Sequence, residues 1–147
     1  MPIRLLVMLV AVFVLGACAP DEPEELDGFS TSTIWIDEHE LVVVVAETPR
    51  QRSQGLMGVT DLGGLDGMLF VFQSESTGGF WMKDTLIPLD IAFFDAGGVL
   101  VDVLTMEPCT ADPCPSYRPS GPYLTAVEAP AGDFDFIVPS SRLEIAD

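Results

Sequence analysis

The sequence predicts a mainly β protein, a compact β-sandwich or barrel-like domain with one short helix. Three observations lead to this fold class: short apolar or alternating segments recur along the chain, glycine and proline residues separate them, and only one segment carries the signals of a helix start. The chain has 147 residues, which leaves enough length after an N-terminal leader to bury one hydrophobic core. We therefore expect a single domain.

The first two predicted strands lie near the start of this domain. Residues 30–36 alternate polar and apolar side chains, as in a strand with one buried face. Residues 41–46 form a continuous apolar run rich in valine, which indicates a strand buried on both faces. His39, the only histidine, falls between the two strands, and we interpret it as an exposed turn residue.

One helix is predicted directly after the second strand. Thr48 can cap its first turn, Pro49 suits the first helical position, and Gln51 can close a capping box. Glycine follows within one or two turns, so the helix is expected to be short.

Further strands are predicted between the helix and the C-terminus. The sequence AGG at 96–98 joins two of them and is a strong hairpin signal. Short strands with glycine and proline between them are typical of a sandwich or barrel. These predicted strands are residues 68–72, 79–83, 89–95, 99–106, 123–128 and 133–138.

The N-terminal residues have the pattern of an export signal. Arg4 supplies a positive charge, and the apolar run at 5–15 is too short to span a bilayer comfortably. The run ends in LGAC at 15–18, which is the bacterial lipobox pattern, so we expect Cys18 to carry the lipid anchor. The alternative is an ordinary secretory signal followed by a chance cysteine.

Three parts of the chain follow from this leader. Residues 1–17 are the predicted signal peptide, residues 18–29 a lipidated acidic tether, and residues 30–147 a single β domain. The stretch at 21–27 holds five acids and one proline, a composition that favours a disordered tether.

The chain is strongly acidic. It has 23 Asp and Glu residues against 6 Lys and Arg residues, for a net charge of −17 at pH 7. Such a surface repels nucleic acid and anionic lipid head groups. It could attract cationic partners or metal ions, but a solvated acidic surface without a specific partner is the interpretation we favour.

The two cysteines that remain after Cys18 are expected to form a disulfide. Cys109 and Cys114 lie in a proline-rich segment, residues 107–122, of an exported and therefore oxidised chain. The bond would fix the shape of this loop. A thiolate metal site is the alternative, although two ligands alone argue against it.

Four stretches of the chain together resemble the domain-of-unknown-function family 192, an uncharacterised group of small exported or membrane-tethered proteins. The resemblance covers the chain from about residue 41 to the C-terminus and implies a compact, mainly β fold without a settled activity. Many relatives have Asn where this chain has Asp84, so a role that needs an amide would be lost here. The four stretches are QGLMG at 54–58, GMLFVF at 67–72, FWMKDTLIPLD at 80–90 and the cysteine loop at 108–117.

The sharpest cluster of charged residues is Lys83, Asp84 and Asp90, and Lys83 is the only lysine in the chain. An acid in a strand with large apolar neighbours must be paired or protonated. The cluster could form a pocket in which Lys83 and a carboxylate bind or polarise a ligand. The alternative is a buried Lys83–Asp90 pair that fixes the strand register. The full set of candidate ligand-pocket residues is Lys83, Asp84, Asp90, Arg50, Trp81 and Tyr117.

The sequence favours a lipid-anchored cell-envelope protein that acts as a ligand-binding or accessory module, because no complete catalytic set is present. The competing hypothesis is an envelope enzyme that uses Lys83 with Asp84 or Asp90 as acid–base groups. A third is a soft-metal carrier, since the thioethers of methionines 57, 68, 82 and 106 could bind Cu(I), although core filling is their default role.

The expected partners follow from the anchor and the charge. We expect a membrane contact through the lipid, an unidentified small-molecule, glycan or protein partner, no nucleic acid, no cofactor, no resident metal and a monomeric state. The expected location is extracytoplasmic, at the cell membrane or outer membrane of a bacterium.

Overall fold

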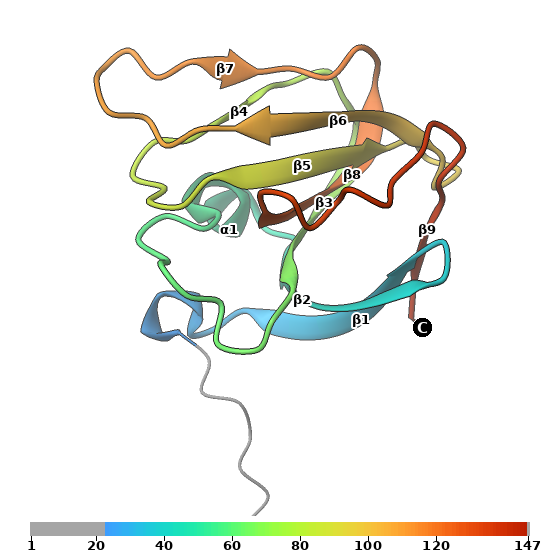
Figure 1. Ribbon diagram of the computed structural model, residues 1–147, viewed down its shortest axis with the longest axis horizontal. Helices are drawn as coiled ribbons and strands as arrows, with labels where there is room; N and C mark the ends of the chain where they lie inside the picture. The colour runs from blue at the N-terminus through green and yellow to red at the C-terminus, as the bar shows by residue number, and fades with distance from the viewer. Residues whose placement is uncertain (1–22, 147) are drawn as a thin grey trace, which may run out of the picture.

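The structure, a computed structural model, describes residues 23–146. The predicted signal peptide and the lipidation residue Cys18 lie outside the described residues. Within them the chain folds into a curled seven-stranded sheet, a separate two-stranded sheet and one short α-helix (Figure 1). The predicted mainly β fold with one short helix is confirmed.

The large sheet has the strand order β6-β5-β8-β3-β2-β1-β9. All neighbouring strands in it run antiparallel except β2 and β3, which are parallel and connected through the helix. Its strands are β1 (Ser30–Ile36), β2 (His39–Ala46), β3 (Gly67–Ser76), β5 (Leu89–Phe94), β6 (Leu100–Met106), β8 (Tyr123–Pro130) and β9 (Leu143–Ile145). The small sheet pairs β4 (Phe80–Trp81) with β7 (Ser116–Tyr117).

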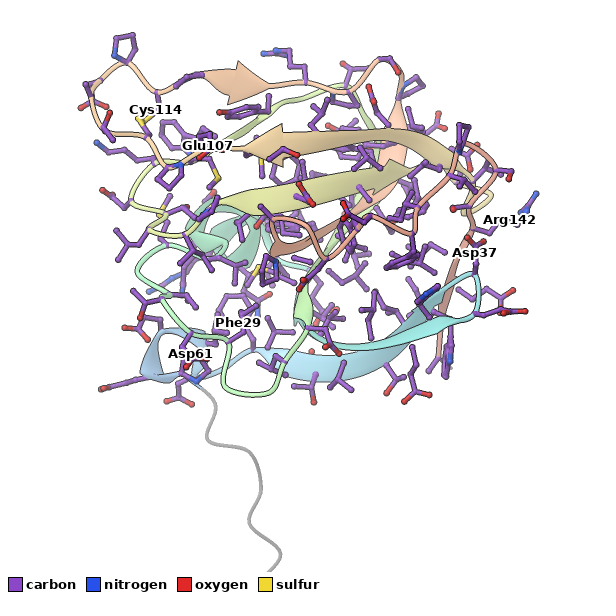
Figure 2. The ribbon with its side chains drawn as sticks, viewed as in Figure 1. Phe29, Asp37, Asp61, Glu107, Cys114 and Arg142 are labelled. Carbon is purple, nitrogen blue, oxygen red and sulfur yellow. A yellow bond between two sulfur atoms is a disulfide. The ribbon has the colours of Figure 1, made fainter. Side chains whose placement is uncertain are left out.

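The large sheet curls into a half-barrel because its end segments meet. Val99, beside the β5–β6 turn, forms a β-bridge with Arg142, just before β9. The carboxylate of Asp37 in the β1–β2 turn accepts a hydrogen bond from the backbone N–H of Arg142 at 2.9 Å, and Figure 2 shows the two residues side by side. Hydrogen bonds from Ser141 and from the Arg142 backbone hold the pKa of the Asp37 carboxyl below its usual range.

The helix α1 (Pro49–Gln54) begins as its sequence predicts. The Thr48 hydroxyl accepts from the Gln51 N–H at 3.2 Å, and the Gln51 side chain accepts from the Thr48 N–H at 3.0 Å. Both halves of the capping box are therefore present. Gly55, at a φ of 51°, ends the helix after six residues.

Other segments of the chain cover both faces of the curled sheet, and a separate hydrophobic core lies on each face. One core lies under α1, the following loop and the small sheet, and it includes Phe70, Phe93 and Tyr123. The other lies on the opposite face under the segment between β8 and β9, and it includes Val127 and Phe134. Since β5 and β8 are inner strands of a sheet that is covered on both faces, nearly all of their side chains are buried.

The structure differs from the sequence prediction at residues 133–138. Apolar and acidic residues alternate there, but the segment forms consecutive turns, closed by the hydrogen bonds Asp133 N to Pro130 O and Ile137 N to Phe134 O. Phe134 is buried in the second core, so its hydrophobicity serves to cover the sheet rather than to extend it. The last strand is instead β9.

Two predicted boundaries also shift. The strand predicted at 79–83 is shorter, because only Phe80 and Trp81 pair with β7. The predicted tether at 18–29 overlaps the packed domain, since a 3-10 helix at Glu24–Leu26 places Leu26 in the first core with no exposed surface. No helix in the described residues is long and apolar enough to cross a membrane.

Candidate functional site

Two hollows lie next to each other at one end of the molecule. The first, called here the loop hollow, has a volume of about 340 Å³. One wall is the turn after β4, and the other is the start of the cysteine loop between β6 and β7, which lies beside that turn in Figure 1. The residues that line it are Lys83, Asp84, Thr85, Leu86, Pro108, Cys109, Thr110, Ala111 and Asp112.

The cysteine loop owes its shape to three constraints. A disulfide joins Cys109 and Cys114, as the sequence predicts, with the Cα atoms 5.5 Å apart. The loop base is held where the Glu107 N–H donates to the Tyr117 hydroxyl at 3.2 Å. Tyr117 also pairs with Phe80 across the small sheet. Figure 2 labels Glu107 and Cys114 on this end of the molecule.

Lys83 crosses the loop hollow and pairs with the cysteine loop. Its ammonium group lies 3.3 Å from both carboxylate oxygens of Asp112. The side chains are 37% and 74% exposed, so water screens this pair and its net contribution to stability is about 0–1 kcal/mol. The ammonium group can therefore exchange its partner at little cost.

Asp84 owes its position to the backbone. Its φ of 54° is in the left-handed region, where Asp and Asn are better tolerated than other residues with a side chain. Its carbonyl accepts a hydrogen bond from Gly58 at 2.9 Å, which ties this turn to the loop after α1. This backbone conformation explains an Asp or an Asn at position 84 without a role for an amide.

The second hollow, called here the aromatic pocket, is narrow, with a volume of about 30 Å³. It lies where the C-terminal end of α1 meets β3, β4 and β8, and it shares Thr85 with the loop hollow. Trp81 stands at its opening, with 55% of its surface exposed. The lining residues are Arg52, Ser53, Gln54, Gly55, Leu56, Met57, Phe70, Phe80, Trp81, Thr85 and Glu128.

Glu128 is the one acid that lines the aromatic pocket. It is 4% exposed, and its register partners on the neighbouring strands are Met68 and Ile91, so its side chain shares an apolar face. Among residues 23–146 no group donates a hydrogen bond to its carboxyl, whose oxygens keep contact with solvent, and burial of the residue raises its pKa to about 8. At neutral pH this group is mainly a neutral carboxylic acid.

Arg52 does not neutralise Glu128. Its guanidinium donates to the backbone carbonyls of Glu47 at 2.6 Å and Val71 at 2.9 Å, and it lies 4.8 Å from the centroid of the Phe72 ring. In the described part of the chain the only ion pair within 4.0 Å is that of Lys83 and Asp112. Within residues 23–146 the carboxyl of Glu128 therefore has no charged partner.

The structure brings together some of the predicted site residues and separates others. Lys83 and Asp84 line the loop hollow, and Trp81 lines the neighbouring aromatic pocket. The Tyr117 hydroxyl holds the base of the cysteine loop through its hydrogen bond with Glu107. Arg50 lies exposed on α1 and lines neither hollow.

Asp90 is buried outside both hollows, and its carboxylate is hydrogen-bonded to neighbouring residues. Its carboxylate accepts from the Thr105 hydroxyl at 2.6 Å and from the Gly132 N–H at 2.8 Å. The proposed Lys83–Asp90 pair is therefore not formed, because Lys83 reaches Asp112 instead. Asp90 fixes the β5–β6 pair and the turn after β8.

The sequence prediction did not include Glu128 among the site residues, although the sequence around it indicates a buried acid. It stands within LTAVEAP at 124–130, where small and apolar residues occupy both alternating faces. A strand of this kind is central and buried on both sides, so an acid within it must lose its water. Glu128, like Asp90, is an acid in a strand with large apolar neighbours and must be paired or protonated.

A metal site gains little support from the described residues. Between residues 23 and 146 no three His, Cys, Asp or Glu side chains cluster as potential ligands. Met68, Met82 and Met106 are buried in the first core, where they fill space.

Comparison with known proteins places this arrangement in a known group. The profile of the family DUF192, described as "Uncharacterized ACR", matches residues 32–145, well over half of the chain. No curated protein matches the chain.

Two crystal structures share the fold. A candidate transcription regulator from Sinorhizobium meliloti 1021 is 27% identical, with a TM-score of 0.70 over 80% of this chain and 95% of that one. A protein of unknown function from Novosphingobium aromaticivorans DSM 12444 is 25% identical, with a TM-score of 0.71 over 87% of this chain and 94% of that one.

Proposed function

This chain belongs to the DUF192 family, and we propose that it is a lipid-anchored, extracytoplasmic binding module that takes a small ligand in the aromatic pocket and the adjoining loop hollow. One observation carries the proposal: the carboxyl of Glu128, a residue that is 4% exposed, receives no hydrogen bond from residues 23–146 and keeps its contact with solvent in a pocket that an exposed tryptophan also lines. Buried polar groups are normally paired, so an unpaired one in a pocket indicates a ligand site.

The size and the walls of the two hollows support this assignment. The loop hollow, about 340 Å³, is large enough for a small molecule, and the aromatic pocket beside it can hold one terminal group of the same molecule. Stretches that carry the family resemblance, 54–58, 80–90 and the cysteine loop, supply most of the lining. Apolar and aromatic side chains alternate in the lining with polar groups that can orient a ligand.

The disulfide supports an extracytoplasmic location. Bonds of this kind form and persist in oxidising compartments, and the Cys109–Cys114 bond closes a surface loop where reductants could reach it. The lipid anchor at Cys18 is a proposal from the sequence, because that residue lies outside the described ones.

Nucleic acid is a poor candidate for the ligand. A net charge of −17 repels a phosphate backbone, and nucleic-acid affinity depends on positive charge. We therefore do not extend the description of the S. meliloti structure as a candidate transcription regulator to this chain.

A general acid is the second function that one observation favours, because Glu128 carries a proton at neutral pH. It would replace Lys83, Asp84 and Asp90 as the acid of the enzyme hypothesis. However, acid–base catalysis commonly needs a second group, and Glu128 is the only carboxyl or imidazole that lines the aromatic pocket. Binding is the function that this geometry supports better.

The proposal can be tested with four-carbon probes that differ only in their head groups: n-butylammonium, n-butanol, butyramide and butyrate. Each is titrated into the ¹⁵N-labelled Cys18→Ser chain, purified after export. We expect at least one probe to shift the backbone signals of Gly55 and Thr85 and the indole signal of Trp81 in a saturable way.

The two tryptophans provide a matched pair of variants. Trp81→Ala should weaken binding of the active probe, whereas Trp35→Phe in β1 should leave it unchanged. Absence of saturable shifts with all four probes, or shifts scattered over the surface, would overturn the proposed binding function.

A further inference from the structure

The aromatic pocket contains an acceptor that lacks a donor. Glu128 can accept several hydrogen bonds when ionised, yet no N–H or O–H group of residues 23–146 donates to it. A ligand that binds the ionised carboxylate must bring donors with it. A primary ammonium group brings three donors together with the positive charge that an ionised carboxylate requires.

The walls of the pocket also suit a cation. Phe70, Phe80 and Trp81 line it, and the Phe70 and Phe80 rings meet edge to face with centroids 4.9 Å apart. Aromatic faces attract ammonium groups through their quadrupole, and tryptophan does so most strongly. An anionic head group would be repelled by the aromatic faces and by the ionised carboxylate of Glu128.

The two cations that line the hollows, Arg52 and Lys83, are each bound to other groups, so neither is paired with Glu128. Apart from Glu128, the only ionisable side chain that lines the pocket is Arg52. Its guanidinium donates hydrogen bonds to the backbone carbonyls of Glu47, just before α1, and of Val71 in β3. The nearest groups in the loop hollow are Lys83, which pairs with Asp112, and Asp84. The overall charge of −17 raises the local concentration of cations near the surface.

The volume sets the size of the group that enters. About 30 Å³ accommodates roughly two water molecules, or one methylene with its ammonium group. The remainder of the ligand must leave past Trp81 and Thr85 into the loop hollow, where there is room for a small molecule. The pocket thus suits the terminal ammonium group of an extended amine.

We propose that the ligand is a small primary amine whose ammonium group is held by Glu128 between Phe80 and Trp81, an inference that rests on the proposed binding function. The carboxylate supplies the charge partner, the rings supply the walls, and the loop hollow takes the rest of the molecule. Tertiary and quaternary amines are excluded from the deep position by its size.

The test compares n-butylammonium with n-butanol, which has the same chain without the charge. The Cys18→Ser chain is titrated at pH 7 and pH 9 and followed by the Trp81 indole signal. We expect n-butylammonium to bind at least ten-fold more tightly than n-butanol at pH 9. A primary alkylamine is still mainly protonated there, like lysine with a pKa of about 10.4.

The pH dependence gives a second readout. With a pKa of about 8, Glu128 is roughly one-tenth ionised at pH 7 and nine-tenths ionised at pH 9, so the affinity for n-butylammonium should rise roughly ten-fold. A ligand that instead accepts a hydrogen bond from the protonated acid would bind more weakly at pH 9. That opposite trend would overturn the proposal.

Glu128→Gln and the matched variant Glu144→Gln, in the exposed edge strand β9, complete the test. Glu128→Gln should abolish both the preference for the ammonium and the rise with pH, and Glu144→Gln should preserve them. If n-butanol binds as tightly as n-butylammonium in the pocket, the ligand class is wrong while the binding function stands. If no probe binds in the pocket at all, both the proposed ligand class and the proposed binding function are wrong.

Discussion

The backbone carbonyl oxygen of Glu128 in β8 lies so close to Gly67 in β3 that no Cβ atom fits between them. The neighbouring pair Met68 and Glu128 are register partners, so this contact lies at the start of the β3–β8 ladder, beside the aromatic pocket. Only a glycine allows the two central strands to approach in this way. The contact therefore fixes the backbone from which the Glu128 side chain extends.

Gly67→Ala should consequently destabilise the protein. The added methyl group collides with backbone atoms that cannot rotate away, so we expect a loss of roughly 1–3 kcal/mol or more in the free energy of unfolding. Urea unfolding measures this loss. Gly97→Ala is the control, because a Cβ there meets only a side-chain atom, an Asp95 carboxylate oxygen, at 3.3 Å in an exposed turn. An equal loss in both variants would contradict this explanation.

The raised pKa of Glu128 predicts how stability depends on pH. In the unfolded chain the carboxyl ionises near its usual pKa of 4.5, whereas in the folded protein it ionises near 8. Between these values the folded state binds more protons than the unfolded state, so this contribution is complete below about pH 4.5 and is lost as the pH rises to 8. The loss amounts to a few kcal/mol, since each pKa unit corresponds to about 1.4 kcal/mol.

Glu128→Gln isolates this contribution because an amide does not titrate. The difference in unfolding free energy between the variant and the parent should shift in favour of the variant from pH 5 to pH 9, as measured by urea unfolding at several pH values. Glu144→Gln should show no such shift. A difference that stays constant with pH would show that Glu128 is already ionised in the folded protein.

Local sequence signals predicted much of the fold. The capping box at Thr48 and Gln51, the glycine turn between β5 and β6, and the disulfide depend on residues close together in the chain, and all three are present. The strand prediction for the segment around Phe134 is wrong, because alternation alone does not distinguish a strand from a run of turns that covers a core.

The candidate site was less predictable because it depends on contacts between distant segments. Lys83 and Asp112 are 29 residues apart, and nothing near either one identifies its partner. Glu128 could have been recognised from its apolar strand, but the pocket in front of it needs α1, β3 and β4 together. Local patterns identified the elements, whereas the curl of the sheet decided which residues meet.

The Lys83–Asp112 ion pair should contribute little to stability. Both side chains are substantially exposed, so Lys83→Met should change the unfolding free energy by less than about 1 kcal/mol and the melting temperature by only a few degrees. A double-mutant cycle with Asp112→Asn measures the coupling directly. A fall of many degrees, or a coupling of several kcal/mol, would mean that Lys83 has a structural role.

The disulfide should stabilise the cysteine loop more than the whole domain. Replacing both Cys109 and Cys114 by Ser should lower the unfolding free energy by about 2 kcal/mol, the loop-entropy value for so short a ring. The parent protein treated with dithiothreitol should match the double variant, and the double variant should not respond to the reductant. The two samples would differ if the serine side chains disturbed the packing of Cys109 against the first core.

The lipid anchor makes a prediction about location that is independent of the pocket. If Cys18 carries two acyl chains, the protein partitions stably into the membrane fraction of a bacterial host, because each buried methylene contributes about 0.8 kcal/mol. Cys18→Ser should move the protein to the soluble extracytoplasmic fraction, whereas Ala19→Ser should remain with the membrane. Immunoblots of separated fractions measure both. A Cys18→Ser protein that has lost residues 1–17, as checked by mass spectrometry, and still fractionates with membranes like the parent would refute the anchor.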